Sequence, residues 1–135
     1  KMNREIKFRV WDVENKEMLE VQELDFEPTF YGGRIAIRPD QYNDYFDTED
    51  MILMQYTGLH DKSGKEIYEG DIVYCQTKFG KAKAIIKFID GKFVAYWDSI
   101  LTHPQNGHCI ACYEINKRFE VIGNIYDNPE LLGGE

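Results

Sequence analysis

The chain has 135 residues and a formal net charge of −8 at neutral pH. Because an acidic surface repels phosphate backbones, this charge argues against a general nucleic-acid-binding protein. Its 43% hydrophobic and 14% aromatic content is sufficient for a packed core, and the length is typical of one domain. We therefore expect residues 2–135 to form a single domain.

Cysteine content and apolar runs indicate the compartment. The three cysteines are too few and too unevenly placed for a disulfide framework, which favours reduced thiols and a cytoplasmic protein. No apolar run approaches the ~20 residues that a membrane span requires. We expect a cytoplasmic protein without a membrane partner.

The N-terminal third predicts a hairpin followed by shorter elements. Apolar Ile6, Phe8 and Val10 alternate with Lys7, Arg9 and Trp11, which is typical of a half-buried strand. Turn residues follow, and residues 18–24 supply the returning strand. Residues 34–37 predict a short strand, and the acidic segment 40–50 predicts an exposed loop or a short helix.

Glycines recur every sixth residue at Gly58, Gly64 and Gly70. Glycine adopts positive φ without a Cβ clash, and Asp61 and Ser63 can hydrogen-bond nearby backbone amides. The spacing matches no phosphate-binding loop, because the GxxxxGK[ST] pattern is absent and no helix follows. We interpret the glycines as corners between short strands at residues 51–59, 65–68 and 71–77.

Residues 81–97, KAKAIIKFIDGKFVAYW, give the clearest hairpin signal. Asp90–Gly91 is a two-residue turn sequence between two strand-like arms. One face of the first arm carries Ala82, Ala84, Ile86 and Phe88, and the other carries Lys81, Lys83, Ile85 and Lys87. The lysines indicate either the solvated face of a strand, where they discourage edge-to-edge aggregation, or an anion-binding stripe.

The C-terminal part predicts a polar loop at residues 102–108, strands at 109–115 and 118–126, and a short final helix. Asp127 or Asn128 would cap this helix, Pro129 would take its first position and Gly133 would end it. The chain as a whole predicts a mostly β fold, either a bent antiparallel sheet or a partly open barrel, with a short C-terminal helix.

His103, His108, Cys109 and Cys112 are the one cluster with metal-ligand residue types, and they could offer four ligands to Zn²⁺. An extended CIAC segment, however, sends its two cysteines to opposite faces, and the segment has no turn former inside it. Buried thiols beside a polar loop are the favoured interpretation, as is a core position for Cys75. We therefore expect no cofactor, with zinc as the alternative.

No serine lies in a nucleophile-elbow context, and no spacing singles out a pair of catalytic carboxylates. The sequence leans away from an enzyme and names no catalytic residue. Exposed aromatic residues are more suggestive, because Trp and Tyr are strong interface anchors.

Three segments resemble the YopX family of small phage and prophage proteins. They are REIKFRVWD at 4–12, LMQYTGLHDKSGKEIYEGDIV at 53–73, and FEVIGNIYDNPELL at 119–132. The resemblance implies a β-rich, barrel-like fold, a bacterial or bacteriophage cytoplasmic setting, and no catalytic residues to carry over. The segment HPQNGHCIAC is not a motif of that family.

The leading hypothesis is a phage or prophage accessory protein that acts as a non-enzymatic interaction module, with a host or phage protein as its partner. The candidate binding residues are Lys78, Lys81, Lys83, Lys87, Lys92, Trp11, Tyr68 and Trp97. One alternative is a nucleic-acid-binding small β-barrel that uses the same lysines and aromatics, although the net charge opposes it. The other is a zinc- or thiol-dependent enzyme around His103, His108, Cys109 and Cys112, and a homo-oligomer through an exposed sheet edge is compatible with each.

Overall fold

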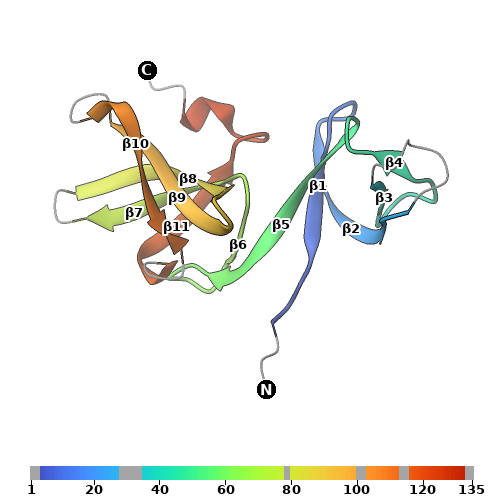
Figure 1. Cartoon of the computed structure of the whole chain (residues 1–135), viewed down its shortest axis with the longest axis horizontal. Helices are drawn as coiled ribbons and strands as arrows, with labels where there is room; N and C mark the ends of the chain where they lie inside the picture. Colours follow the sequence, from blue (N-terminus) through green and yellow to red (C-terminus); the bar gives the residue numbers. More distant parts are fainter. Residues whose placement is uncertain (1–3, 28–34, 78–79, 100–102, 113–115, 133–135) are drawn as a thin grey trace. The chain divides into compact units, whose positions relative to one another are not determined.

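The computed structural model describes residues 4–27, 35–77, 80–99, 103–112 and 116–132; the side chains of residues 77, 97–99 and 103–111 lie outside this description. Strands dominate the described residues, and the helical elements whose full extent is described are two short 3₁₀ segments (Figure 1). The predicted mostly β class is confirmed.

Two compact units divide the chain, residues 1–55 and residues 56–135. Strand β5 (Met51–His60) contributes its first half to unit 1 and its second half to unit 2. The strands form two antiparallel sheets, in the orders β4-β3-β2-β1-β5-β6 and β10-β9-β8-β7-β11, and neither order closes into a barrel. A single domain over residues 2–135 stays a prediction.

Unit 1 is built around the predicted N-terminal hairpin. Its other strands are β1 (Phe8–Asp12), β2 (Glu17–Asp25), β3 (Ala36–Pro39) and β4 (Phe46–Asp47). The predicted alternation holds only in part: Val10 is fully buried, but Phe8 is half-buried like Arg9 and Trp11. Ile6, predicted on the buried face, precedes β1 and is exposed. The short strand predicted at 34–37 begins two residues later, at Ala36, and Arg34 lies outside the described residues. The unit's core comprises Val10, Leu19, Ile37 and Met51.

The Asp12 carboxylate stabilises the turn of the β1–β2 hairpin. Its carboxylate accepts hydrogen bonds from the backbone amides of Glu14 and Asn15 and from the side chains of Asn15 and Tyr42. Burial alone would raise the pKa of Asp12, but these hydrogen bonds stabilise the charged form and lower its pKa below the usual value. The turn is therefore fixed by an ionised carboxylate.

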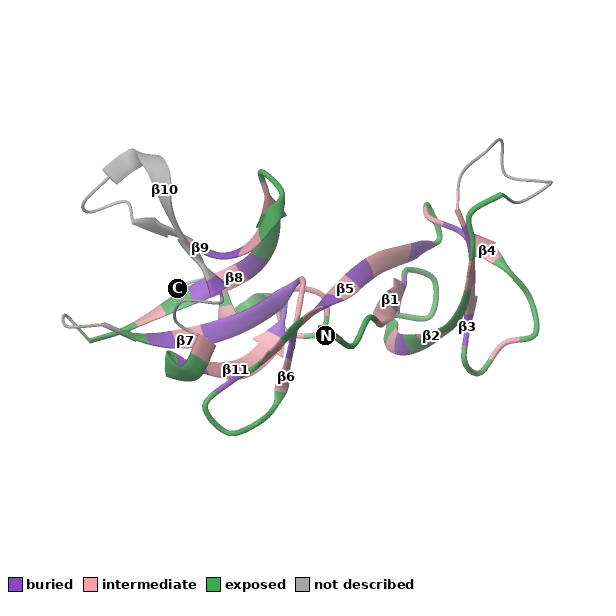
Figure 2. Ribbon diagram, turned by 60° about the horizontal axis from the view of Figure 1, so that its bottom comes forward, coloured by how far each residue is buried: buried purple, intermediate pink, exposed green. Residues whose placement is uncertain are grey.

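Unit 2 contains the five-stranded sheet, together with β6 and the second half of β5 from the six-stranded one. Its strands are β6 (Glu66–Tyr68), β7 (Asp71–Thr77), β8 (Gly80–Ile89), β9 (Lys92–Ser99), β10 (His103–Ala111) and β11 (Phe119–Asn124). Residues from β6, β7, β8, β9 and β11 form its core, and β7 is buried along most of its length (Figure 2). Cys75 is a core residue as predicted, with 3% of its surface exposed.

Two of the three predicted glycine corners are confirmed, because Gly64 and Gly70 lie in the turns before β6 and β7. Gly58 instead lies inside β5, where the pairing with β6 is irregular. Gly58, Gly64 and Gly70 have φ of 86°, 89° and 86°, a region that residues with a Cβ rarely adopt. The Asp90–Gly91 turn joins β8 to β9, and both of its residues also have positive φ, as a type I′ hairpin turn requires.

The polar loop predicted at residues 102–108 is wrong, because β10 begins at His103 and runs to Ala111. In the described sheet β10 lies at one edge, where a proline such as Pro104 removes no interior hydrogen bond. The pairing with β9 shifts register between His103 and His108, and this irregularity accommodates the polar segment within a strand.

The short C-terminal helix is a single 3₁₀ turn, η2 (Pro129–Leu131), with Pro129 in its first turn as expected. Asn128 occupies the capping position, but its side chain accepts a hydrogen bond from the amide of Asn124 instead of capping η2. A second turn, η1 (Asn116–Arg118), precedes β11 and was not predicted. Among the described residues, no helix has the length and apolar character to cross a membrane.

Candidate functional site

Three of the candidate lysines share one face of β8, which lies between β7 and β9. The strand registers place Lys83 opposite Tyr74 of β7, and Ile85 opposite Tyr96 of β9. Residues that pair in antiparallel strands point to the same side of the sheet. We call this surface the Lys–Tyr face; it comprises Tyr74, Lys81, Lys83, Ile85, Lys87 and Tyr96.

Two lysines of the Lys–Tyr face lie over tyrosine rings. The Nζ atom of Lys81 is 5.4 Å from the ring centroid of Tyr74, and that of Lys87 is 4.3 Å from the centroid of Tyr96. Such cation–π contacts contribute about 0.5–1 kcal/mol at exposed sites. They restrict where the two ammonium groups lie on the exposed face of β8.

The third lysine contacts the C-terminal turn. Lys83 donates a hydrogen bond of 2.8 Å from Nζ to the backbone oxygen of Leu131. The turn approaches β11 closely at Gly123, where an added Cβ would lie 2.5 Å from Oδ1 of Asn128 and 3.0 Å from Cδ1 of Leu131. The turn therefore borders the Lys–Tyr face, and Lys83 marks that border.

A position inside the sheet changes the interpretation of these lysines. Lysines that discourage edge-to-edge aggregation belong on edge strands. Because β8 is hydrogen-bonded on both sides, edge protection does not account for Lys81, Lys83 and Lys87.

The remaining candidate binding residues lie elsewhere or outside the description. Lys92 is exposed in the first position of β9, beside the hairpin turn. Tyr68 is half-buried in β6, with its ring 5.4 Å from that of Tyr56, and Trp11 is half-buried in β1 of unit 1. Lys78 and the side chain of Trp97 lie outside the described residues. The structure thus brings together Lys81, Lys83 and Lys87 and adds Tyr74 and Tyr96.

The two tyrosines were not among the sequence-derived site residues. Tyr96 could have been found by folding the hairpin about Asp90–Gly91, because a two-residue turn pairs Ile89 with Lys92 and hence Ile85 with Tyr96. Tyr74 required the register between β7 and β8, which no turn signal in the sequence specifies.

The proposed zinc ligands are described only in part. The side chains of His103, His108 and Cys109 lie outside the described residues. Cys112 is fully buried, and this burial raises the pKa of its thiol to about 12. Among the residues with described side chains, no group of three or more His, Cys, Asp or Glu is arranged to hold a metal ion. Zinc binding here stays an untested prediction.

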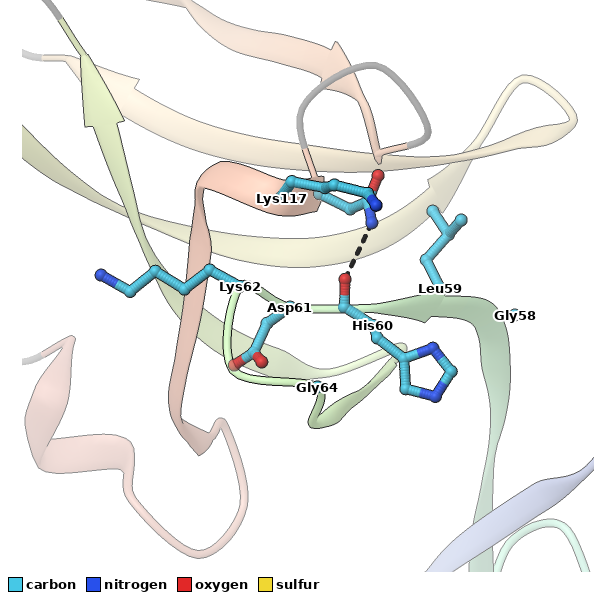
Figure 3. A pocket seen from close by; sticks show the side chains of 8 residues that line it. Gly58, Leu59, His60, Asp61, Lys62, Gly64 and Lys117 are labelled. Carbon is cyan, nitrogen blue, oxygen red and sulfur yellow. Dashed lines mark hydrogen bonds between the residues drawn. The ribbon is translucent and has the colours of Figure 1, made fainter.

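An open hollow of about 460 Å³ lies where the end of β5 and the following turn face η1 (Figure 3). Its polar side chains do not converge: His60 points away from Lys62, and the Asp61 carboxylate turns back into its own loop. Asn116 donates a 2.8 Å hydrogen bond to the backbone oxygen of His60 across the hollow. The hollow therefore lies where two segments of unit 2, the turn after β5 and η1, contact each other.

The Asp61 side chain connects the turn after β5 to β11. Its carboxylate accepts hydrogen bonds from the amides of Ser63 and Lys65 within the turn, and from the amide of Val121 in β11. Burial acts to raise the pKa of Asp61, but the three amides outweigh it and lower the pKa. The sequence predicted the local bonds but not the distant one to Val121.

A comparison with protein families decides the identity of the fold. The model of the YopX family, described as YopX protein, matches residues 7–133. The chain belongs to the YopX family. This YopX-family chain is similar to the crystal structure of protein EF1440 from Enterococcus faecalis, with 28% identity and a TM-score of 0.60, over 96% of this chain and 99% of that one.

It is also similar to the crystal structure of yopX from Bacillus subtilis, with 23% identity, a TM-score of 0.58, and coverage of 93% and 96%. That second likeness shows the fold alone. None of the curated proteins compared with the chain matches it.

Proposed function

We propose that this YopX-family chain is an accessory protein of phage or prophage origin that acts in the bacterial cytoplasm as a non-enzymatic interaction module. Its partner is a protein with an acidic surface, and its contact surface is the Lys–Tyr face. The observation that carries the proposal is the placement of three exposed lysines on a central strand, with two of them positioned by tyrosines of the neighbouring strands.

The distribution of charge supports a local basic contact in an acidic protein. Residues 1–55 carry 13 acidic and 7 basic residues, whereas residues 56–135 carry 11 and 9. Three of the nine bases in unit 2 lie on one face of β8. Electrostatic complementarity of this kind selects partners and orients them as they approach.

The cation–π contacts favour a protein over single-stranded nucleic acid. Proteins that bind single strands stack bases on the faces of aromatic side chains. On the Lys–Tyr face, an ammonium group already lies over each tyrosine ring. The surface therefore suits recognition of carboxylates better than stacking of bases.

The buried ionisable groups of unit 2 support a structural role for its interior. The carboxylate of Asp61 is committed to three amides, and one carboxylate oxygen of Asp71 accepts the amide of Tyr68. The raised pKa of Cys112 opposes formation of a nucleophilic thiolate at neutral pH. These groups hold turns and core together, which suits a binding module.

The test is capture of partners from a lysate of the native bacterial host with three immobilised proteins. They are the wild type, K81E/K83E/K87E, and a control, K16E/K65E/K117E, that makes the same change of charge at lysines that are not part of the Lys–Tyr face. The proposal expects a partner that the wild type and the control retain and that the face variant loses. A partner retained equally by all three, or none enriched by the wild type, would overturn it.

A second arm addresses nucleic acid. Binding of a single-stranded and a double-stranded oligonucleotide is measured by fluorescence anisotropy at low salt and again at 200 mM salt. Binding that the face variant loses and that falls steeply with salt would replace the protein partner with nucleic acid.

A further inference from the structure

On the Lys–Tyr face an apolar residue of β8 lies between two lysines of the same strand. A row here means a residue of β8 together with the residues paired with it in β7 and β9. Along β8, Lys81 and Lys87 occupy the outer rows, and Ile85 lies between them on the same face. Ile85 is half-buried, so part of its side chain is open to a ligand. Beside it, Ile72 of β7 lies on the same side of the sheet but is fully buried, so Ile85 is the apolar side chain of this row that a ligand can reach.

The cation–π contacts draw the two charges toward this apolar row. Tyr74 stands opposite Lys83, one row inward from Lys81, and Tyr96 stands opposite Ile85, one row inward from Lys87. On an extended strand the Cα atoms of Lys81 and Lys87 are about 20 Å apart. The Cα atoms of Lys83 and Ile85, the two positions between them on this face, are about 7 Å apart. The ammonium groups therefore lie at a separation between these two limits.

The contact between Lys83 and the C-terminal turn limits the shape of a ligand. The ammonium of Lys83 donates a hydrogen bond to the carbonyl of Leu131, so the C-terminal turn limits how far a ligand can extend from β8 toward β11. The exposed lysines at either end leave the direction along β8 open. A narrow, extended segment fits this surface better than a broad one.

We propose that the Lys–Tyr face binds an extended peptide segment in which an apolar residue lies between two acidic residues at alternate positions, acid–x–apolar–x–acid. On an extended chain these three side chains point to one side, and the two acids are about 13 Å apart. The carboxylates pair with Lys81 and Lys87, and the apolar side chain covers Ile85. This inference rests on the proposed function, for which it names the chemistry of the partner.

The experiment measures binding of a fluorescein-labelled peptide, Ser-Asp-Ser-Leu-Ser-Asp-Ser, to the full-length protein by anisotropy in low-salt buffer. Two comparison peptides separate the parts of the pattern. One replaces Leu by Ser, and the other places both acids side by side with the Leu outside them, so that composition is unchanged. We expect each change to weaken binding about tenfold, equivalent to ~1.4 kcal/mol.

Protein variants locate the site. K81Q/K87Q should weaken binding of the first peptide about tenfold, whereas K65Q/K117Q, with the same loss of charge, should leave it within about twofold. Competition by an unlabelled thymidine oligonucleotide at the same salt concentration tests the phosphate alternative. Displacement at a lower concentration than unlabelled peptide requires would assign the face to nucleic acid and overturn the inference.

The remaining outcomes separate this inference from the proposed function. No binding of the first peptide, or equal binding of all three peptides, would overturn the acid–x–apolar–x–acid pattern. A host partner that depends on Lys81, Lys83 and Lys87 would still support the interaction module in that case. If the peptide pattern holds but no host protein is captured, the recognition chemistry stands and the proposed cellular role fails.

Discussion

Asp61 joins two segments of unit 2 through the three hydrogen bonds of one carboxylate. Two of its hydrogen bonds shape the turn after β5, and the third reaches the amide of Val121, 60 residues further along the chain. Hydrogen bonds to a charged group contribute about 1.5–3 kcal/mol each, and removing the acceptor leaves buried donors unpaired. This side chain therefore has a larger effect on folding than its place in a loop suggests.

We expect Asp61→Ala to lower the free energy of unfolding by about 3 kcal/mol or more, because three amides lose their acceptor at once. Asp61→Asn keeps one acceptor oxygen and should cost less. Urea unfolding followed by circular dichroism measures both values. An alanine variant within 1 kcal/mol of wild type, on the scale of one neutral hydrogen bond, would show that water replaces the carboxylate.

Acid should destabilise the protein through the same group. The pKa of Asp61 is lowered in the folded state from its ordinary value of 3.8. Its contribution is thus fully present above the unfolded-state pKa and is lost as the pH falls through the folded-state pKa. We expect stability to decline below about pH 4, and less steeply in Asp61→Asn. Parallel urea titrations at several pH values check this, and identical slopes would exclude Asp61.

The cysteines give a separate residue-scale prediction. Burial raises the pKa of both Cys75 and Cys112, and the thiolate is the reactive form. In a Cys109→Ser variant, which leaves these two thiols, we expect little reaction with Ellman's reagent at pH 8 in the folded state and full reaction in denaturant. Rapid labelling of the folded protein would show that the core around Cys112 opens readily.

The C-terminal turn shows how one element depends on a missing side chain. Gly123 lies in β11, and an added Cβ would fall within 3.0 Å of both Asn128 and Leu131. The side chain of Asn128 also accepts a hydrogen bond from the amide of Asn124, and the backbone oxygen of Leu131 accepts one from the ammonium of Lys83. Any displacement of the turn therefore disturbs its hydrogen bonds to β11 and to β8 together.

We expect Gly123→Ala to destabilise the protein by about 1–3 kcal/mol, the usual cost of forcing extra volume into a packed site. Asn128→Gly removes the nearest clashing atoms, so the same alanine should cost less in that background. Thermal unfolding of the four proteins of this double-mutant cycle provides the values. Equal costs in both backgrounds would mean that Asn128 moves aside freely.

Local signals predicted those elements whose pattern is complete within a few residues. The β8–β9 hairpin combined period-two alternation with Asp90–Gly91, and the corners at Gly64 and Gly70 required only positive φ. The first part of β10, residues 103–108, was predicted as a loop because Pro104 and Gly107 are loop residues by local preference, and only pairing with β9 overrides it. The Lys–Tyr face likewise depends on register, so its lysines were predicted and its tyrosines were not.

At the scale of the whole molecule, β5 is the element common to both units. Residues Met51–Gln55 pair with β1, and Tyr56 and His60 pair with β6. Among the described residues each unit has its own buried cluster, with four buried residues in unit 1 and eight in unit 2. A unit of about 55 residues is marginally stable by itself, because little surface is buried on folding. We therefore expect unit 1 to depend on the continuity of β5 for its stability.

Cooperativity between the units can be measured, because the chain's two tryptophans, Trp11 and Trp97, lie in β1 and β9. Single-tryptophan variants, W97F and W11F, report each unit by fluorescence. We expect coincident urea transitions, and Ile37→Ala, which removes a fully buried side chain from unit 1, should lower both midpoints equally at a cost of about 2–5 kcal/mol. Ile86→Ala provides the matched change in unit 2. If Ile37→Ala lowered only the Trp11 transition, residues 2–135 would be two domains, and the strand that joins them would be a linker.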